Sequence, residues 1–278
     1  MFADRPSRTA QHNALFRAIE QRLPQPLFAD PWARRFLRGR YRLAALLPAA
    51  ALARAIDAHW PGPRAAVCVR TRWIDDAISA AIARGLDQLV LLGAGFDARA
   101  HRLPGIERVR VFEVDHPATQ AMKRALVGPA PGHVTYVPID LLRDALPDAL
   151  ARAGMKTGEE TLILWEGVTN YLDEPSVDTT IRFAARAGTA LLFTYVDRAV
   201  IDGQTAFPGG PESVAYVQKL GEPFTFGFAA AEVGAYLAQR GLALEEDLPL
   251  SDVARRYYPD ACPPVSAYYH VVSARCRA

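Results

Sequence analysis

A glycine-rich turn with an acidic residue inside it is the part of this sequence that points most directly to chemistry. Gly93, Gly95 and Ala98 fit the spacing G-x-G-x-x-G/A, which lets a ligand approach the backbone between a strand and a helix. Asp97 stands within the turn, where it would repel the two phosphate charges of a dinucleotide. S-adenosylmethionine carries no phosphate and has an ammonium beside a sulfonium, so the turn favours that cofactor. The alternative is that Asp97 caps the following helix or points to solvent.

Further acidic residues follow the next three apolar segments. Glu113 and Asp115 come 20 and 22 residues after Gly93, where a carboxylate can accept hydrogen bonds from both hydroxyls of a ribose. Asp140 could accept a hydrogen bond from an adenine amino group, and Glu166 would lie beside the same cleft. NAD enzymes also hold a ribose with an acid, so that feature alone does not separate the two cofactors. The whole set of acids indicates a cleft for an adenosine that carries a cation.

A cofactor carboxylate needs a cationic partner, and two arginines precede the first strand. Arg70 and Arg72 lie in a segment, residues 67–84, whose apolar spacing predicts a helix ending at Gly85. Residues two apart cannot share one face of a helix, so at most one of these arginines points to the cleft.

The acceptor side offers no decisive general base. His270 on the last predicted strand and His116 after the second are candidates, although a histidine on a strand is more often structural. Tyr171, Thr194 and Tyr195 lie at or near strand ends and could line an acceptor pocket, with ordinary packing as the equal alternative.

A mostly parallel sheet would bring these residues together. Short apolar runs alternate with helical segments, which predicts a doubly wound α/β fold with its ligand at the carboxyl ends of the strands. The last two strands have a short link with little helical pattern, which predicts an antiparallel hairpin at the sheet edge. The predicted strands are 88–95, 109–115, 133–141, 160–168, 189–197, 242–248 and 266–276, with helices at 117–126, 144–154, 175–187 and 229–241.

Two further segments surround the sheet. The N-terminal part begins with a predicted amphipathic helix over residues 7–23, for which Ser7 or Thr9 is a suitable N-cap. A stretch rich in glycine, proline and aromatic residues is predicted to cover an apolar or aromatic substrate, with a dimer surface as the alternative. Its aromatic residues include Phe207, Tyr216, Phe224, Phe226 and Phe228. We divide the single structural domain into a helical cap (1–85), a core (86–197 and 241–278) and an insertion (198–240).

Composition narrows the choice of partners. The chain has 278 residues, half of them apolar, and a net charge of +2, which gives no reason to expect nucleic acid or a membrane as a partner. Its three cysteines include no C-x-x-C pair, and its six histidines are scattered, so we expect free thiols and no metal site. The N-terminus lacks the apolar core of a secretion signal, which favours a cytoplasmic location.

Several ordered motifs resemble the leucine carboxyl methyltransferase family. Within it, the similarity is to a bacterial branch of class I S-adenosylmethionine-dependent methyltransferases that includes O-methyltransferases of polyketide biosynthesis. The similarity covers most of residues 7–197 and fades through the insertion. The motifs are "SRTAQHNALFRAIEQRLPQPLFADPWARRFL", "VRTRWIDD", "LLGAGFDARAHRLP", "VFEVDHP", "PIDL" and "LWEGVTNYL".

The resemblance implies a seven-stranded Rossmann-like methyltransferase sheet with an antiparallel C-terminal strand. It implies that Arg70 binds the cofactor carboxylate, that Glu166 lies near the methionyl amine, and that Gly93 faces the methionyl part. One departure is Ala98, where the family often has threonine. The other expected cofactor-binding residues are Ala94, Gly95, Asp97, Asp115, His116, Asp140 and Leu141.

The sequence therefore predicts an S-adenosylmethionine-dependent O-methyltransferase acting on a small molecule by in-line displacement. A carboxylate is the favoured acceptor, with a phenol or enol of an aromatic or polyketide-like compound as the other choice. The acceptor-site candidates are Tyr171, Tyr195 and His270. The alternative functions are an NAD-dependent oxidoreductase and a non-catalytic protein that binds S-adenosyl ligands. A homodimer stays open as the oligomeric state.

Overall fold

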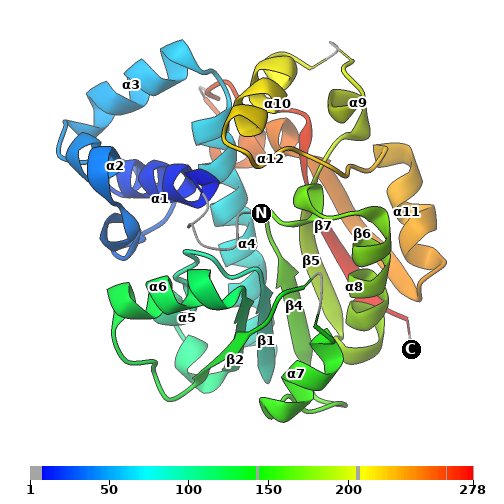
Figure 1. Ribbon diagram of the computed structural model, residues 1–278. Helices are drawn as coiled ribbons and strands as arrows, with labels where there is room; N and C mark the ends of the chain where they lie inside the picture. Colours follow the sequence, from blue (N-terminus) through cyan, green and yellow to red (C-terminus); the bar gives the residue numbers. More distant parts are fainter. Residues whose placement is uncertain (1–7, 142–143, 205–206, 261, 278) are drawn as a thin grey trace.

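The sheet at the centre of the fold has seven strands in the order β3-β2-β1-β4-β5-β7-β6 (Figure 1). The computed structural model describes residues 8–141, 144–204, 207–260 and 262–277. The first five strands in this order are parallel, and β7 runs antiparallel to both of its neighbours. The strands are β1 Gln88–Leu92, β2 Arg110–Asp115, β3 Val134–Pro138, β4 Thr161–Trp165, β5 Ala190–Val196, β6 Leu242–Pro249 and β7 Tyr269–Cys276.

Helices cover both faces of the sheet, which is why β1 and β4 are buried along their whole length and are apolar after their first residues, Gln88 and Thr161. One face packs against α7 (Leu146–Arg152), α8 (Glu174–Ala187) and α11 (Ala230–Ala238). The other packs against α4 (Pro63–Ala83) and α12 (Leu250–Tyr257). The remaining helices are α5 Arg99–Arg102, α6 Pro117–Val127, α9 Arg198–Ile201 and α10 Gly210–Lys219, with 3₁₀ turns at Ile106–Arg108 and Thr169–Tyr171.

The predicted alternation of strands and helices is confirmed, but the end of the chain differs from the simple hairpin. The link between β6 and β7 contains α12, whose Leu250, Val253 and Ala254 are fully buried. Charged residues of α12 hid this one apolar face from the sequence pattern. Strand β7 also lies between β5 and β6, so that β6 is the edge strand.

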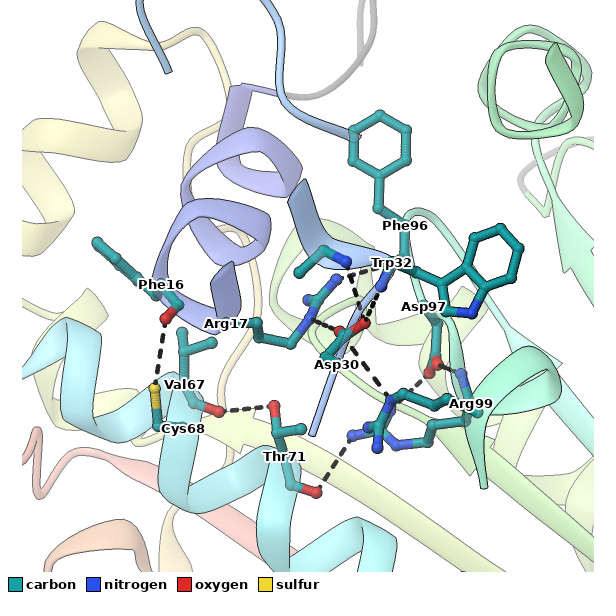
Figure 2. Close-up of polar contacts among 12 residues, drawn as sticks. Phe16, Arg17, Asp30, Trp32, Val67, Cys68, Thr71, Phe96, Asp97 and Arg99 are labelled. Atoms are coloured by element: carbon teal, nitrogen blue, oxygen red, sulfur yellow. Dashed lines mark hydrogen bonds and ion pairs between the residues drawn. The ribbon is translucent and has the colours of Figure 1, made fainter. Parts of the chain in front are cut away.

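The part of the N-terminal cap before α4 packs against the glycine turn rather than against the sheet. It contains α1 (Arg8–Glu20), a 3₁₀ turn (Ala33–Phe36), α2 (Gly39–Ala44) and α3 (Ala49–His59) before α4. Phe36 of the cap stacks on Phe96 of the turn at 5.0 Å. The Arg17 guanidinium donates a 2.7 Å hydrogen bond to the Phe96 carbonyl (Figure 2). The cap and the turn are therefore one packed unit.

Two details of the cap bear on the sequence predictions. Thr9 lies inside α1 and does not cap it, while Ser7 lies outside the described residues.

No helix among the described residues has both the length and the apolar character needed to cross a bilayer.

Glu113 belongs to the core instead of the ligand cleft. Its carboxylate forms an ion pair with Lys123 of α6 at 2.6 Å, and both side chains are 1% exposed. Successive residues of a strand point to opposite faces, so Glu113 and Asp115 lie on the same face of β2. The two acids differ in that Glu113 is paired with Lys123 in the core. Burial raises the pKa of Glu113, and Lys123 opposes that rise.

Lys123→Met should destabilise the protein by about 3–5 kcal/mol at neutral pH, because it leaves a buried carboxylate without its cation. Since the pKa of Glu113 is already raised in the folded state, the loss should be smallest in acid and should grow as the pH rises through that pKa. Urea unfolding across this range measures the effect. The double variant Glu113→Gln/Lys123→Met should be more stable than the single one. A double variant no better than Lys123→Met would contradict the assignment.

Candidate functional site

The glycine turn at the carboxyl end of β1 uses its own amide groups internally. Gly93 and Gly95 have φ angles of +67° and +45°, a region open mainly to glycine. The amides of Gly93 and Ala94 donate to the Val114 carbonyl at 2.8 and 3.0 Å, and the amide of Gly95 donates to the Asp115 carboxylate. A dinucleotide loop needs such amides for the pyrophosphate. This turn therefore suits a ligand without phosphates.

A buried network of charges lies directly beside the turn. Arg99 is at its centre and contacts Asp75 at 2.7 Å, Asp97 at 2.5 Å and Glu166 at 2.6 Å. Arg70 of α4 adds a second contact to Glu166 at 2.7 Å. The network joins α4, the loop after β1 and the end of β4, and part of it is visible around Asp97 and Arg99 in Figure 2.

The arginines keep the acids of this network ionised. Burial alone would raise the pKa of Glu166, but Arg99 and Arg70 outweigh it and hold that pKa at about 2. Burial also opposes ionisation of Asp97, whose pKa the same Arg99 lowers. Both carboxylates are therefore charged across the physiological range and can accept hydrogen bonds from a cationic ligand group.

Asp97 differs from the prediction, because it is not an unpaired acid facing a ligand. Its carboxylate accepts hydrogen bonds from both the backbone amide and the guanidinium of Arg99. The capping alternative thus describes part of what Asp97 does. The stronger evidence against a pyrophosphate is the internal use of the turn's amides.

The two arginines of α4 divide as their spacing predicts. Arg70 is buried, contacts Glu166 and lies 5.3 Å from the ring of Tyr269. Arg72 is half-buried, pairs with Asp76 one turn later and donates to the Leu27 carbonyl. Only Arg70 can meet a ligand in the cleft.

The other predicted cofactor residues lie where β2 and β3 end. Asp115 accepts a 2.6 Å hydrogen bond from the His116 amide, and His116 caps α6 by accepting from Ala118. Burial raises the pKa of Asp115, while the amides of Gly95 and His116 oppose that rise. After β3, Asp140 and Leu141 follow in a loop, with Leu141 packed against the core. These ends are adjacent because β2 and β3 pair in parallel.

A cavity of about 90 Å³ adjoins the network on the side of the cap. Arg70 and Gly167 line it, so it begins where the network ends. The described lining residues include one arginine and no carboxylate. They are Thr9, His12, Asn13, Phe16, Trp60, Pro63, Ala66, Val67, Arg70, Gly167, Tyr171, Ser213, Tyr216, Val217, Phe224, Ser266, Tyr268 and Tyr269.

The three acceptor-site candidates fall in two places. Tyr171 lines the cavity and lies 5.8 Å from the ring of Phe224. Tyr195 and His270 do not line it. They stack on each other across β5 and β7, and both contact the Asp247 carboxylate, at 2.9 and 2.8 Å. Thr194 accepts a hydrogen bond from the Gly167 amide and so supports the cavity wall indirectly.

Residues 198–240 contribute both to the cavity and to the core. Tyr216 and Phe224 line the cavity, while Phe226 and Phe228 are buried in the main core cluster. Phe207 packs elsewhere, against a small cluster with Val196 and Tyr268.

Sequence reasoning missed most of the cavity wall. His12 of α1 is the clearest case, because its Nε2 lies 2.8 Å from the Tyr216 hydroxyl and 3.1 Å from the Tyr41 hydroxyl. Trp60 lies 4.6 Å from the same Tyr216 ring. These residues are far apart in the chain, and nothing in their local sequence indicates that they meet.

Comparison with known proteins agrees with this geometry. The sequence model described as leucine carboxyl methyltransferase matches residues 10–185. A candidate S-adenosyl-L-methionine-dependent methyltransferase of Frankia alni is 37% identical over 211 residues, 72% of each chain. Another from Streptomyces coelicolor is 34% identical over 218 residues, 74% of this chain and 75% of that protein.

Solved structures share the fold at low sequence identity. A candidate methyltransferase of Thermobifida fusca has a TM-score of 0.61 at 16% identity and covers 100% of this chain and 97% of its own. A DUF574 family protein of Streptomyces avermitilis has a TM-score of 0.63 at 14% identity, with 98% of both chains covered. These similarities concern the fold alone.

Gly93→Ala should lower the free energy of unfolding by more than the cost of placing alanine at a positive φ. A Cβ at Gly93 would lie 2.4 Å from Val168 Cγ2, and the φ of +67° disfavours any side chain. We expect the free energy of unfolding to fall by about 2–5 kcal/mol, of which the contact between the new Cβ and Val168 contributes about 1–3 kcal/mol. Thermal or urea unfolding measures it.

Gly85→Ala is the control, because Gly85 has a φ of +95° at the end of α4 and nothing within 4 Å of an added Cβ. It should show only the backbone cost. Val168→Ala in the Gly93→Ala background should restore part of the loss. Equal losses for Gly93→Ala and Gly85→Ala would show that crowding at Val168 is unimportant.

Proposed function

The chain belongs to the leucine carboxyl methyltransferase family, and from that premise we propose that it methylates an oxygen atom of a small anionic or phenolic acceptor. It is an S-adenosylmethionine-dependent methyltransferase, which removes the dehydrogenase alternative. Within the family, the proposal places it with the bacterial O-methyltransferases of polyketide biosynthesis. A carboxylate is the favoured acceptor, and a phenol or enol is the second choice.

The residues beside the glycine turn fit S-adenosylmethionine. The amides of Gly93, Ala94 and Gly95 already donate to acceptors within the protein, and the adjacent network offers both charged acceptors and a guanidinium. In the proposal, Arg70 holds the carboxylate of S-adenosylmethionine, and Glu166 and Asp97 face its amine. The backbone of Gly93, Ala94 and Gly95 lies along the methionyl part. Asp115 and His116 hold the ribose, and Asp140 and Leu141 hold the adenine.

The observation that carries the acceptor class is the charge of the cavity wall. Aromatic rings surround the cavity, no carboxylate belongs to its described lining, and the charge of Arg70, the one arginine of that lining, is shared with Glu166. An aromatic acid would bury its ring against Phe16, Trp60 or Phe224 and would meet no repelling carboxylate in that lining. A cationic amine would find no acidic partner there.

The protein's main contribution is alignment. When bound, S-adenosylmethionine supplies a methyl group on a sulfonium with a thioether as leaving group. The cavity wall holds the acceptor, and Arg70 and Gly167 at its border keep that acceptor next to the cofactor site. Positioning of this kind can contribute about 7–11 kcal/mol. A carboxylate acceptor is already ionised and needs no base, whereas a phenol would need one, and His12 is the imidazole in the described lining.

The test is product analysis with S-adenosylmethionine carrying a deuterated methyl group. Purified protein is incubated with matched aromatic carboxylic acids, phenols, amines and thiols of one ring size. We expect label on oxygen, with carboxylic acids giving methyl esters that base hydrolyses. Label on nitrogen or sulfur only would overturn oxygen methylation, and tight cofactor binding with no labelled product would favour a non-catalytic protein.

The same assay tests whether residues 198–240 cover the acceptor, as we propose. Phe224→Ala removes a ring from the cavity wall and should raise the acceptor KM roughly tenfold, the effect of losing about 1.5 kcal/mol of apolar contact. Phe207→Ala, in the same segment but outside the lining, is the control and should leave KM unchanged. Cofactor affinity should stay constant in both. Equal effects of the two substitutions would argue against a cover.

A further inference from the structure

The net charge of the whole chain conceals a strongly basic segment in the cap. Residues 31–56 contain no aspartate or glutamate and no lysine. Their six arginines are Arg34, Arg35, Arg38, Arg40, Arg42 and Arg54, all of them exposed. Because the chain totals only +2, the rest of it is net acidic. The net charge of the whole chain, from which no anionic partner was expected, therefore hides this local excess of positive charge.

Three of these arginines line one hollow. Arg34, Arg35 and Arg42 surround a surface depression of about 420 Å³, together with Pro31 and Leu37. Arg35 also lies over the ring of Trp32 at 4.4 Å, which fixes its direction. Within the described part of the chain, no ion pair neutralises any of the three. Like charges that converge without a counter-charge are unfavourable unless an anion binds between them.

Three exposed leucines, here called the leucine corner, follow Arg42 closely in the chain. Leu43 is the next residue of α2, and the connection between α2 and α3 carries Leu46 and Leu47. These leucines are 69%, 59% and 52% exposed, the three largest values among the large apolar residues described. Figure 1 shows α2 and α3 at the outside of the cap, away from the sheet. Exposed apolar groups gathered in this way mark a contact surface.

We propose that the arginine hollow, defined by Arg34, Arg35 and Arg42, binds a phosphate group whose attached chain is apolar and rests on the leucine corner. A phosphate concentrates up to two charges and several acceptor oxygens in one small group, and guanidinium groups bind it in pairs of hydrogen bonds. A partner protein would present single carboxylates spread over a surface. The convergence of three arginines on one depression matches the first geometry better.

The test compares binding of inorganic phosphate, hexyl phosphate and a polyglutamate peptide to the full chain by calorimetry at low ionic strength. Hexyl phosphate should bind more tightly than inorganic phosphate. Arg42→Gln should weaken both roughly tenfold, the effect of losing one charged hydrogen bond. Leu46→Ser/Leu47→Ser should weaken hexyl phosphate and leave inorganic phosphate unchanged.

Arg84→Gln is the matched control, because Arg84 is an exposed arginine at the far end of α4. It removes the same charge and should change nothing. No binding of either phosphate, equal losses for Arg42→Gln and Arg84→Gln, or a preference for polyglutamate would overturn the proposal. All substituted side chains are exposed, and the melting temperature of each variant checks that folding is unchanged.

A vesicle experiment distinguishes the two sources of such a phosphate. The protein is sedimented with vesicles of phosphatidylcholine alone and with added phosphatidylglycerol. Retention on the anionic vesicles that Arg42→Gln abolishes would identify a lipid headgroup. Binding of hexyl phosphate without retention would identify a soluble phosphate ester. Retention that is insensitive to Arg42→Gln would count against the hollow as the site.

Discussion

The buried charge network around Arg99 is the interaction on which the rest of this site depends. Arg99 holds three carboxylates that come from α4, from the turn after β1 and from the end of β4. A buried ion left without its partner costs several kcal/mol, so the three segments are fixed relative to one another. The position of the glycine turn and the border of the cavity both follow from this constraint. The network is therefore a structural part of the cleft as well as the set of groups that we propose to bind the cofactor.

The cap and residues 198–240 supply most of the wall of the cavity beside the network. Phe36 stacking on Phe96 fixes the cap against the turn, and the contact between His12 and Tyr216 joins α1 to α10 across the cavity. Neither element belongs to the sheet that carries the cofactor residues. The cavity that we propose for the acceptor thus lies between the end of α4, which packs on the sheet, and these two segments.

The sequence predicts the fold well because buried parallel strands, helix ends and turns have local patterns. It also placed Asp115, Asp140 and Glu166 at strand ends correctly, since the periodicity that predicts a strand predicts where it ends. It failed where partners are distant in the chain. The sequence predicts Asp97 as an acid of the cleft, with helix capping as the alternative, and offers Glu113 beside Asp115 for the ribose, but Arg99 and Lys123 neutralise Asp97 and Glu113. The cavity wall was mostly missed for the same reason, because His12 and Tyr216 are brought together only by packing.

Calorimetric titration with S-adenosylmethionine, S-adenosylhomocysteine and NADH, repeated with Asp115→Ala, tests most directly that the turn and its charge network hold a phosphate-free adenosyl cofactor. Both S-adenosyl ligands should bind, NADH should not, and Asp115→Ala should weaken binding roughly tenfold through the lost ribose contacts. Binding of NADH without the S-adenosyl ligands, or affinity indifferent to Asp115, would contradict this account of the cleft.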